Sequence, residues 1–182
     1  GKGPLFGSLG LLFLVCVQGA FGAWTVTLKL QPIIVTIHLM LALVLLACLT
    51  AYAQYAWEDK SLAVRTIRIR PLSAQFLALA FVVLFIQVFL GAWVSTNYAV
   101  LACPDFPTCL GSAWPDTNWS EGFTLWRQLG LNAQGEFISP AALQTIHWAH
   151  RLFALLVLVV LGGFGWRAIQ LSTPVLSDLK RM

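Results

Sequence analysis

Charged residues are scarce in this sequence. Asp, Glu, Lys and Arg make up only 10% of the 182 residues, whereas a soluble globular domain carries about 25%. Hydrophobic residues account for 59% of the chain, and the mean hydropathy is +0.80. This scarcity excludes a surface that faces mainly water, so the sequence predicts an integral membrane protein.

Two further features are missing, and their absence argues against a nucleic-acid partner and a signal peptide. The net charge is +4, but the basic residues form no patch interleaved with aromatics, so we expect no nucleic-acid partner. A charged segment followed by a small-residue cleavage site is also missing near the start, so we expect no signal peptide. The chain begins with Gly1 rather than Met, and we expect it to be part of a longer protein whose other helices supply further ligands.

Four apolar stretches are long enough to cross a bilayer, since a membrane helix needs about 20 apolar residues. They cover residues 4–24, 32–54, 71–94 and 140–166. The sequence therefore predicts an all-α membrane protein with four transmembrane helices. We expect a hairpin over residues 1–54, a basic linker over 55–70, and a second hairpin over 71–182 that contains a long outer loop over 95–139.

Basic residues gather at one end of these spans. They are Lys2, Lys60, Arg65, Arg68, Arg70, Arg167, Lys180 and Arg181. By the positive-inside rule, both termini are expected in the cytoplasm and the 95–139 loop outside the cell inner membrane. Trp24 and Trp93 would then mark the outer interface, and Trp57 and Trp166 the inner one.

Two pairs of segments indicate a weak internal repeat. Residues 18–24 and 87–93 share Gln, Gly, Ala and Trp at matching positions, and Thr36-Ile37-His38 matches Thr145-Ile146-His147. The repeat favours a duplicated helical hairpin, and chance similarity between apolar helices is the alternative. Within the outer loop, residues 119–130 are predicted to form a short helix that Ser120 and Gly130 would cap.

All three histidines lie inside predicted spans, where ionisable side chains are costly and usually functional. His38 and His150 lie roughly 9 Å and 15 Å below the outer boundary, at 1.5 Å per residue. A neutral imidazole is a good axial ligand for haem iron. We therefore expect His38 and His150 to bind haem iron, with hydrogen bonding between helices as the alternative, and we assign no role to His147.

Arg151 directly follows His150, and a guanidinium at this depth needs a partner. A haem propionate, backbone carbonyls or a water-filled cavity would each serve. Cys103 and Cys109 flank a short proline-containing segment in the outer loop, where an oxidising exterior favours a disulfide. We expect this disulfide to be structural, with a redox role as the alternative. Cys16 and Cys48 lie within spans and are expected to fill small apolar spaces.

Several of these segments resemble the haem A synthase family. Residues 91–97 and the string Cys103-Pro104-Asp105-Phe106-Pro107-Thr108-Cys109 resemble a helix end and cysteine loop of that family. Residues 24–32 and 35–39 resemble its third and fourth helices, and residues 147–152 resemble its sixth. The resemblance implies an eight-helix fold made of two four-helix bundles, of which this chain would hold helices three to six.

The resemblance also implies a reaction. Haem A synthases oxidise a methyl group of haem O to a formyl group, giving haem A for terminal oxidases, and a bound haem b is thought to relay electrons. By this resemblance His38 and His150 are ligand positions of different bundles, haem O is the substrate, and haem O synthase is a candidate partner. The resemblance does not imply which molecule accepts the electrons. The family's first-half Glu-x-x-His-Arg motif and first cysteine pair are missing here. Because the chain lacks half of each implied site, whose partner ligands would lie on helices two and eight, the isolated chain is expected to be inactive.

Other functions fit parts of the sequence. In a bis-histidine cytochrome b, His38 and His150 would clamp a single haem without catalysis. A quinone-linked thiol oxidase also has four spans and outward cysteines, but it usually needs two outward cysteine pairs, and only Cys103 and Cys109 lie in the outer loop. A structural subunit of a larger complex is a further alternative.

Overall fold

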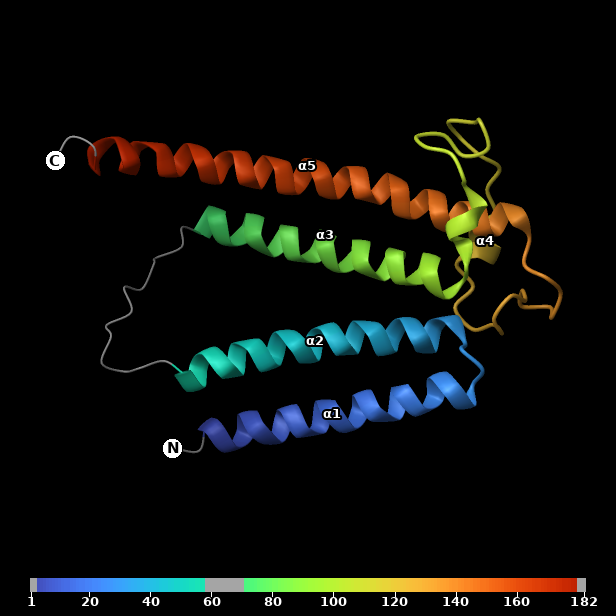
Figure 1. The fold of residues 1–182 in the computed structure, drawn as a ribbon, viewed down its shortest axis with the longest axis horizontal. Coiled ribbons are helices and arrows are strands. Elements are labelled where there is room, and N and C mark those ends of the chain that lie inside the picture. Colours follow the sequence, from blue (N-terminus) through green and yellow to red (C-terminus); the bar gives the residue numbers. More distant parts are fainter. Residues whose placement is uncertain (1–2, 58–70, 180–182) are drawn as a thin grey trace.

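The computed structural model of the chain describes residues 3–57 and 71–179. Its long helices are α1 (Gly3–Thr27), α2 (Pro32–Trp57), α3 (Pro71–Thr96) and α5 (Pro140–Leu179) (Figure 1). The outer loop holds a short 3-10 helix, η1 (Ala99–Ala102), and one turn of helix, α4 (Trp119–Gly122). No extended strand occurs in the described ranges, so the predicted all-α fold class is confirmed.

Each long helix contains a segment that is long and apolar enough to cross a membrane. The segments are Phe6–Thr27, Pro32–Ala56, Ala74–Thr96 and Pro140–Arg167. They agree closely with the windows predicted from the sequence and make the chain a multi-pass membrane protein. Of the basic residues used to orient it, Lys2, Lys60, Arg65, Arg68, Arg70, Lys180 and Arg181 lie outside the described residues. The orientation and the 55–70 linker therefore stay predictions.

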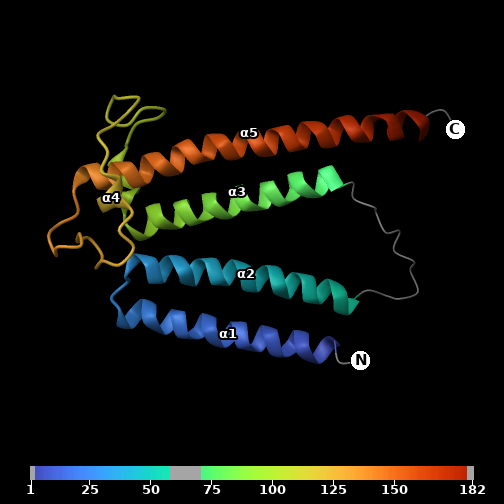
Figure 2. The same ribbon diagram turned by 180° about the vertical axis from the view of Figure 1, so that it is seen from behind.

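The four long helices lie in a row. α1 packs against α2, α2 against α3, and α3 against α5, while no contact joins α1 to α5 in the described part of the chain (Figures 1 and 2). The row therefore does not close into a four-helix bundle. Large apolar side chains such as Phe13 and Phe81 are exposed along it, which suits helices that face lipid or further helices.

The connection between α1 and α2 is tight. Lys29 and Leu30 have φ angles of 51° and 58°, in the left-handed region where helices commonly end. The Leu30 amide donates to the Thr25 carbonyl at 2.8 Å. Pro32 then begins α2, at a position where its missing N–H costs nothing. The chain thus reverses within a few residues and sets α1 and α2 antiparallel.

The best-buried cluster of apolar side chains lies at the outer end of the row, beneath the loop. It consists of Trp93, Val94, Ala99 and Ile146. The Trp93 indole is completely buried and its Nε1 donates to the carbonyl of Gly122 at 2.9 Å. Trp93 therefore contacts the loop rather than lipid, and its depth at the membrane interface stays a prediction. Trp24, its counterpart in the repeat, is 46% exposed.

The helix in the outer loop is shorter than predicted. α4 covers Trp119–Gly122 rather than residues 119–130, and its N-cap is Asn118 rather than Ser120. The Asn118 side chain accepts a hydrogen bond from the Glu121 amide at 3.2 Å. Gly122 is pressed against α5, since a Cβ there would lie 3.0 Å from a backbone oxygen of that helix. A longer helix would gain little, because Trp126 on its apolar face is exposed.

Two charged side chains, Glu121 and Arg127, attach the rest of the loop to the ends of α3 and α5. The Glu121 carboxylate accepts from the Ser139 amide at 2.9 Å, and the bonds from Ser139 hold the pKa of Glu121 below its usual value. Arg127 is buried, and it donates to the Leu131 carbonyl at 3.1 Å and to the side chain of Asn97. Burial lowers the pKa of Arg127, and the nearby Glu121 charge opposes that shift. These contacts tie the loop to α3 and α5.

We predict that Trp93→Phe lowers the thermal stability of the protein. The substitution keeps an aromatic ring but removes the indole N–H, leaving the buried Gly122 carbonyl unpaired at a cost of about 1–3 kcal/mol. The measurement is the thermal unfolding midpoint in detergent, followed by helical circular dichroism. Trp166→Phe, at an exposed tryptophan, is the control and should leave the midpoint unchanged. Equal losses in both variants would contradict this prediction.

Candidate functional site

His38 on α2 lies directly against Gly22 on α1. A Cβ built on Gly22 would stand 3.2 Å from the His38 Cε1 atom, so a larger residue would force the ring a few tenths of an ångström away from the helix. Gln18 lies one helical turn before Gly22. Its Nε2 donates to the His38 carbonyl at 3.1 Å and lies 3.5 Å from the ring Nε2. The side chain of His38 is thus held between a glycine and a glutamine of one neighbouring helix.

The second hairpin repeats this arrangement. His150 on α5 lies against Gly91 on α3, where a Cβ would stand 3.1 Å from the His150 Cε1 atom. Gln87 lies one turn before Gly91, and its Nε2 is 3.1 Å from the ring Nδ1 and 3.4 Å from the His150 carbonyl oxygen. Residues four apart share a helix face. Each hairpin therefore brings one Gln, one Gly and one His together.

The packing also corrects the register of the internal repeat. The matching Thr-Ile-His triplets paired His38 with His147, but His150 takes the place of His38 in the second hairpin. His38 lies six residues after the first residue of α2, whereas His150 lies ten residues after the first residue of α5. α5 therefore extends one turn further outward, where Thr145 accepts a hydrogen bond from the loop amide of Asn118 at 2.7 Å.

His147 does not join His150 in a common site. It is buried, and its Nε2 accepts a hydrogen bond from the Nε of Arg151 at 3.2 Å. Its Nδ1 has no protein partner. Across residues 3–57 and 71–179, no group of three His, Cys, Asp or Glu side chains is arranged to hold a metal ion. The candidate site thus consists of separate imidazoles, His38 in one hairpin and His150 in the other.

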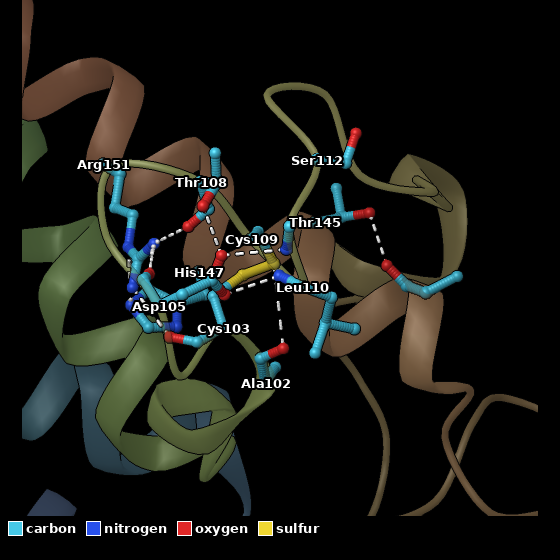
Figure 3. Close-up of a disulfide and its surroundings, with 12 residues drawn as sticks. Ala102, Cys103, Asp105, Thr108, Cys109, Leu110, Ser112, Thr145, His147 and Arg151 are labelled. Carbon is cyan, nitrogen blue, oxygen red and sulfur yellow. Dashed lines mark hydrogen bonds between the residues drawn. A yellow bond between two sulfur atoms is a disulfide. The ribbon is translucent and has the colours of Figure 1, made fainter.

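Arg151 has its partners in the cysteine loop. One terminal nitrogen donates to the carbonyls of Asp105 and Thr108 at 2.7 Å and 2.8 Å, and the other donates to the carbonyl of Cys103 at 2.7 Å (Figure 3). The guanidinium also lies 5.7 Å from the centre of the Phe106 ring. Of the partners left open by the sequence, the structure therefore has backbone carbonyls, and they come from a loop rather than a helix.

A disulfide closes this loop. Cys103 and Cys109 are bonded, with their Cα atoms 4.6 Å apart (Figure 3). Both are buried against Trp148 of α5. Burial and the anchoring of a loop are typical of a disulfide with a structural role. The free cysteines Cys16 and Cys48 are exposed in this chain, and their role as small apolar fillers stays a prediction.

Asp105 shapes the segment between the two cysteines. Its carboxylate accepts from the amides of Leu110 at 2.6 Å and Gly111 at 2.9 Å, and from the hydroxyl of Thr108. These hydrogen bonds, led by the one from Thr108, lower the pKa of Asp105 to about 2. The carboxylate is therefore charged near neutral pH, and it holds the loop in the shape that presents its carbonyls to Arg151.

Comparison with known proteins gives the family. The sequence model of the COX15-CtaA family, described as cytochrome oxidase assembly protein, matches residues 2–181. The chain is also 37% identical over 161 residues to the haem A synthase of Shewanella oneidensis strain MR-1, which covers 85% of this chain and 45% of that protein. The chain belongs to the haem A synthase family.

A second relative agrees with this assignment. The chain is 24% identical over 159 residues to the haem A synthase of Halalkalibacterium halodurans strain C-125, covering 82% of this chain and 53% of the relative. It thus spans about half the length of the curated relatives it matches. No solved structure matches it. The family resemblance read from the cysteine loop and the histidine segments is confirmed.

The sequence of this haem A synthase family member predicts His38 and His150 as site residues. It does not by itself identify the side chains that hold them. The repeated segments 18–24 and 87–93 contained that signal, because the Gln and Gly they share are the residues that contact the imidazoles. The repeat alone predicts a duplicated hairpin, and the contact of its Gln and Gly with the histidines becomes visible only in the packing of the helices.

We predict that Arg151→Ala exposes the Cys103–Cys109 disulfide to reductant. The substitution removes the three hydrogen bonds that the guanidinium donates to loop carbonyls, besides the one to His147, and each bond from a charged donor contributes about 1.5–3 kcal/mol. Reduction by a mild thiol, followed by alkylation and mass spectrometry, should become at least about tenfold faster. The reason is that losing even one hydrogen bond of that strength makes opening of the loop about tenfold more favourable. Arg167→Ala, whose guanidinium lies over Phe76 at the other end of the span, is the control. Unchanged rates in Arg151→Ala would show that the guanidinium does not close the loop.

Proposed function

We propose that the protein is a haem A synthase, an oxidoreductase that converts a methyl group of haem O to a formyl group and so gives haem A for terminal oxidases. Family membership and the 37% identity to a haem A synthase support the proposal. The observation that carries it is the repeated constellation in which each hairpin holds one imidazole, His38 or His150, against a glycine inside a membrane span.

The residues present fit a haem. Neutral imidazole is a common axial ligand of haem iron, and the mostly apolar porphyrin suits the apolar helix surfaces around His38 and His150. Gly22 and Gly91 let each ring lie close to its neighbouring helix, and the His38 Nδ1 is buried without a protein partner. When bound, haem b would supply electron transfer and haem O would be the substrate. The protein would bind and orient both and keep water from the reacting group.

The arrangement of helices favours two haem sites over one. α2 and α5, which carry His38 and His150, make no contact in the described part of the chain, and α3 lies between them (Figure 1). Each imidazole lies against the glycine of its own hairpin. A cytochrome with a single haem clamped by both histidines would need these helices to face each other. We therefore place His38 and His150 in separate sites, whose second ligands would come from other helices of the longer protein.

The same proposal gives the location of the protein and the source of its substrate. We place the protein in the cell inner membrane, with both termini in the cytoplasm and the disulfide loop outside. Haem O synthase is the candidate source of the substrate, since it makes the haem that this reaction consumes. A thiol oxidase is less well supported, because the Cys103–Cys109 disulfide is buried and so is poorly placed to exchange with an external thiol.

We predict that His38→Ala and His150→Ala act on different haems in the full-length protein. Haem A, measured by chromatography and mass in a host that makes haem O, should be lost in both variants. The reduced-minus-oxidised spectrum of resident haem b should be lost in one variant and retained in the other. Loss of the haem b spectrum in both would favour the single-haem cytochrome, and haem binding by wild-type protein without haem A formation would refute the synthase proposal.

A second prediction tests the glycine contact through a matched pair on α1. Gly22→Ala places a methyl group 3.2 Å from the His38 ring, whereas Gly19→Ala meets no atom within 4 Å. Both changes improve helix propensity by about 1 kcal/mol, so neither should weaken the helix itself. Gly22→Ala should push the His38 ring away by a few tenths of an ångström and lower haem A formation, though less than His38→Ala does, and Gly19→Ala should leave it at the wild-type level. Equal activity in the two alanine variants would mean that the close approach is dispensable.

A further inference from the structure

We propose that Gln87 is a positioning residue for His150. Its side-chain amide would hydrogen-bond to the ring Nδ1, fix the orientation of the imidazole and leave Nε2 to bind haem iron. Gln18 lies near the other ring nitrogen of His38, 3.5 Å from Nε2, so we propose this role for Gln87 alone. This inference rests on the proposed haem-binding function and names a role for a side chain that the function so far does not use.

The contacts around His150 define one orientation of the ring. The Gln87 amide nitrogen is 3.1 Å from Nδ1 and 3.4 Å from Nε2, so Nδ1 is the nearer ring nitrogen. Gly91 supports the Cε1 edge of the ring from the same face of α3. Two fixed contacts on one helix restrict rotation about the side-chain bonds of His150. The hydrogen bond to Nδ1 occupies that nitrogen, and Nε2 is then the nitrogen available to a metal.

The amide oxygen of Gln87 gives the second argument. Oε1 is buried without a hydrogen-bond partner, and such an atom costs about 1–3 kcal/mol in an apolar setting. An imidazole that binds a metal through Nε2 carries its proton on Nδ1 and donates it to a neighbouring acceptor. Rotating the Gln87 amide by half a turn exchanges its nitrogen and oxygen. It would then present Oε1 to the Nδ1–H of a metal-bound His150, which accounts for the unpaired oxygen.

The first hairpin has a related arrangement that differs in the ring nitrogen. Gln18 is also one turn from the supporting glycine and its Oε1 is likewise buried without a partner, but its amide donates to the His38 carbonyl and lies 3.5 Å from Nε2 of the ring rather than near Nδ1. A glutamine used only to tie two helices together would not need to lie beside an imidazole in both hairpins. The competing explanation is that Gln87 merely joins α3 to α5 through the His150 carbonyl, and the test must separate the two.

The test uses the full-length, haem-loaded protein with Gln87→Leu, Gln87→Glu and the control Gln75→Leu, an exposed glutamine on the same helix. We measure the midpoint potential of the haem bound at His150 and its ferric electron paramagnetic resonance spectrum. Removing the acceptor in Gln87→Leu makes the imidazole a weaker electron donor, so the potential should rise and haem affinity should fall about tenfold. A carboxylate in Gln87→Glu is a stronger acceptor, so the potential should fall. Gln75→Leu should match the wild type.

Opposite shifts in the two Gln87 variants are the expected result, because a loss of packing would not reverse its sign with the charge of the acceptor. Potentials and spectra that stay at the wild-type values, or that shift in the same direction in both variants, overturn the positioning role while leaving the proposed function intact. His150→Ala is run in parallel. If it leaves every haem signal unchanged, His150 binds no haem, and the proposed function fails together with this inference.

Discussion

The close contact between an imidazole and a glycine of the neighbouring helix is the feature on which both hairpins depend. Inside a membrane, helices gain little by burying apolar surface against each other, so small residues and polar contacts drive their association. At Gly22 and Gly91 the missing side chain admits a histidine ring, and the nearby glutamine bonds to that histidine. The contact that joins the helices therefore also sets the direction of the imidazole, so packing and the candidate haem site share one cause.

A charge about three turns into α5 places the loop relative to this site. Arg151 follows His150 directly and would be costly in a membrane span without partners. Three loop carbonyls satisfy its guanidinium, and they converge because the disulfide and the Asp105 carboxylate curl the loop around them. The loop is thus fixed to the helix turn that carries His150. The same three carbonyls occupy the guanidinium's terminal nitrogens, so the geometry gives no reason to assign Arg151 to a haem propionate.

The sequence allowed the spans to be predicted well because their signal is local. An apolar stretch of sufficient length, often begun by proline, defines a membrane helix wherever the rest of the chain lies. His38 and His150 could be found for a similar reason, since an ionisable residue in such a stretch stands out. The burial of Trp93, the short α4 and the partners of Arg151 could not be found in this way. Each depends on a contact with a distant segment, as when Trp93 donates to Gly122, and such contacts leave no local pattern.

The register of the internal repeat also depends on contacts with another helix, and the local sequence places it one helical turn away from the packing. Three identical residues matched His38 with His147, and the match was a reasonable guide because it identified α2 and α5 as equivalent helices. The equivalence of side chains is decided by the neighbouring helix, where Gly91 and Gln87 contact His150. His147 instead bonds to Arg151 and lies under the loop. The two hairpins thus share the contact between imidazole and glycine, while the first turns of α5, which meet the longer loop, make different contacts.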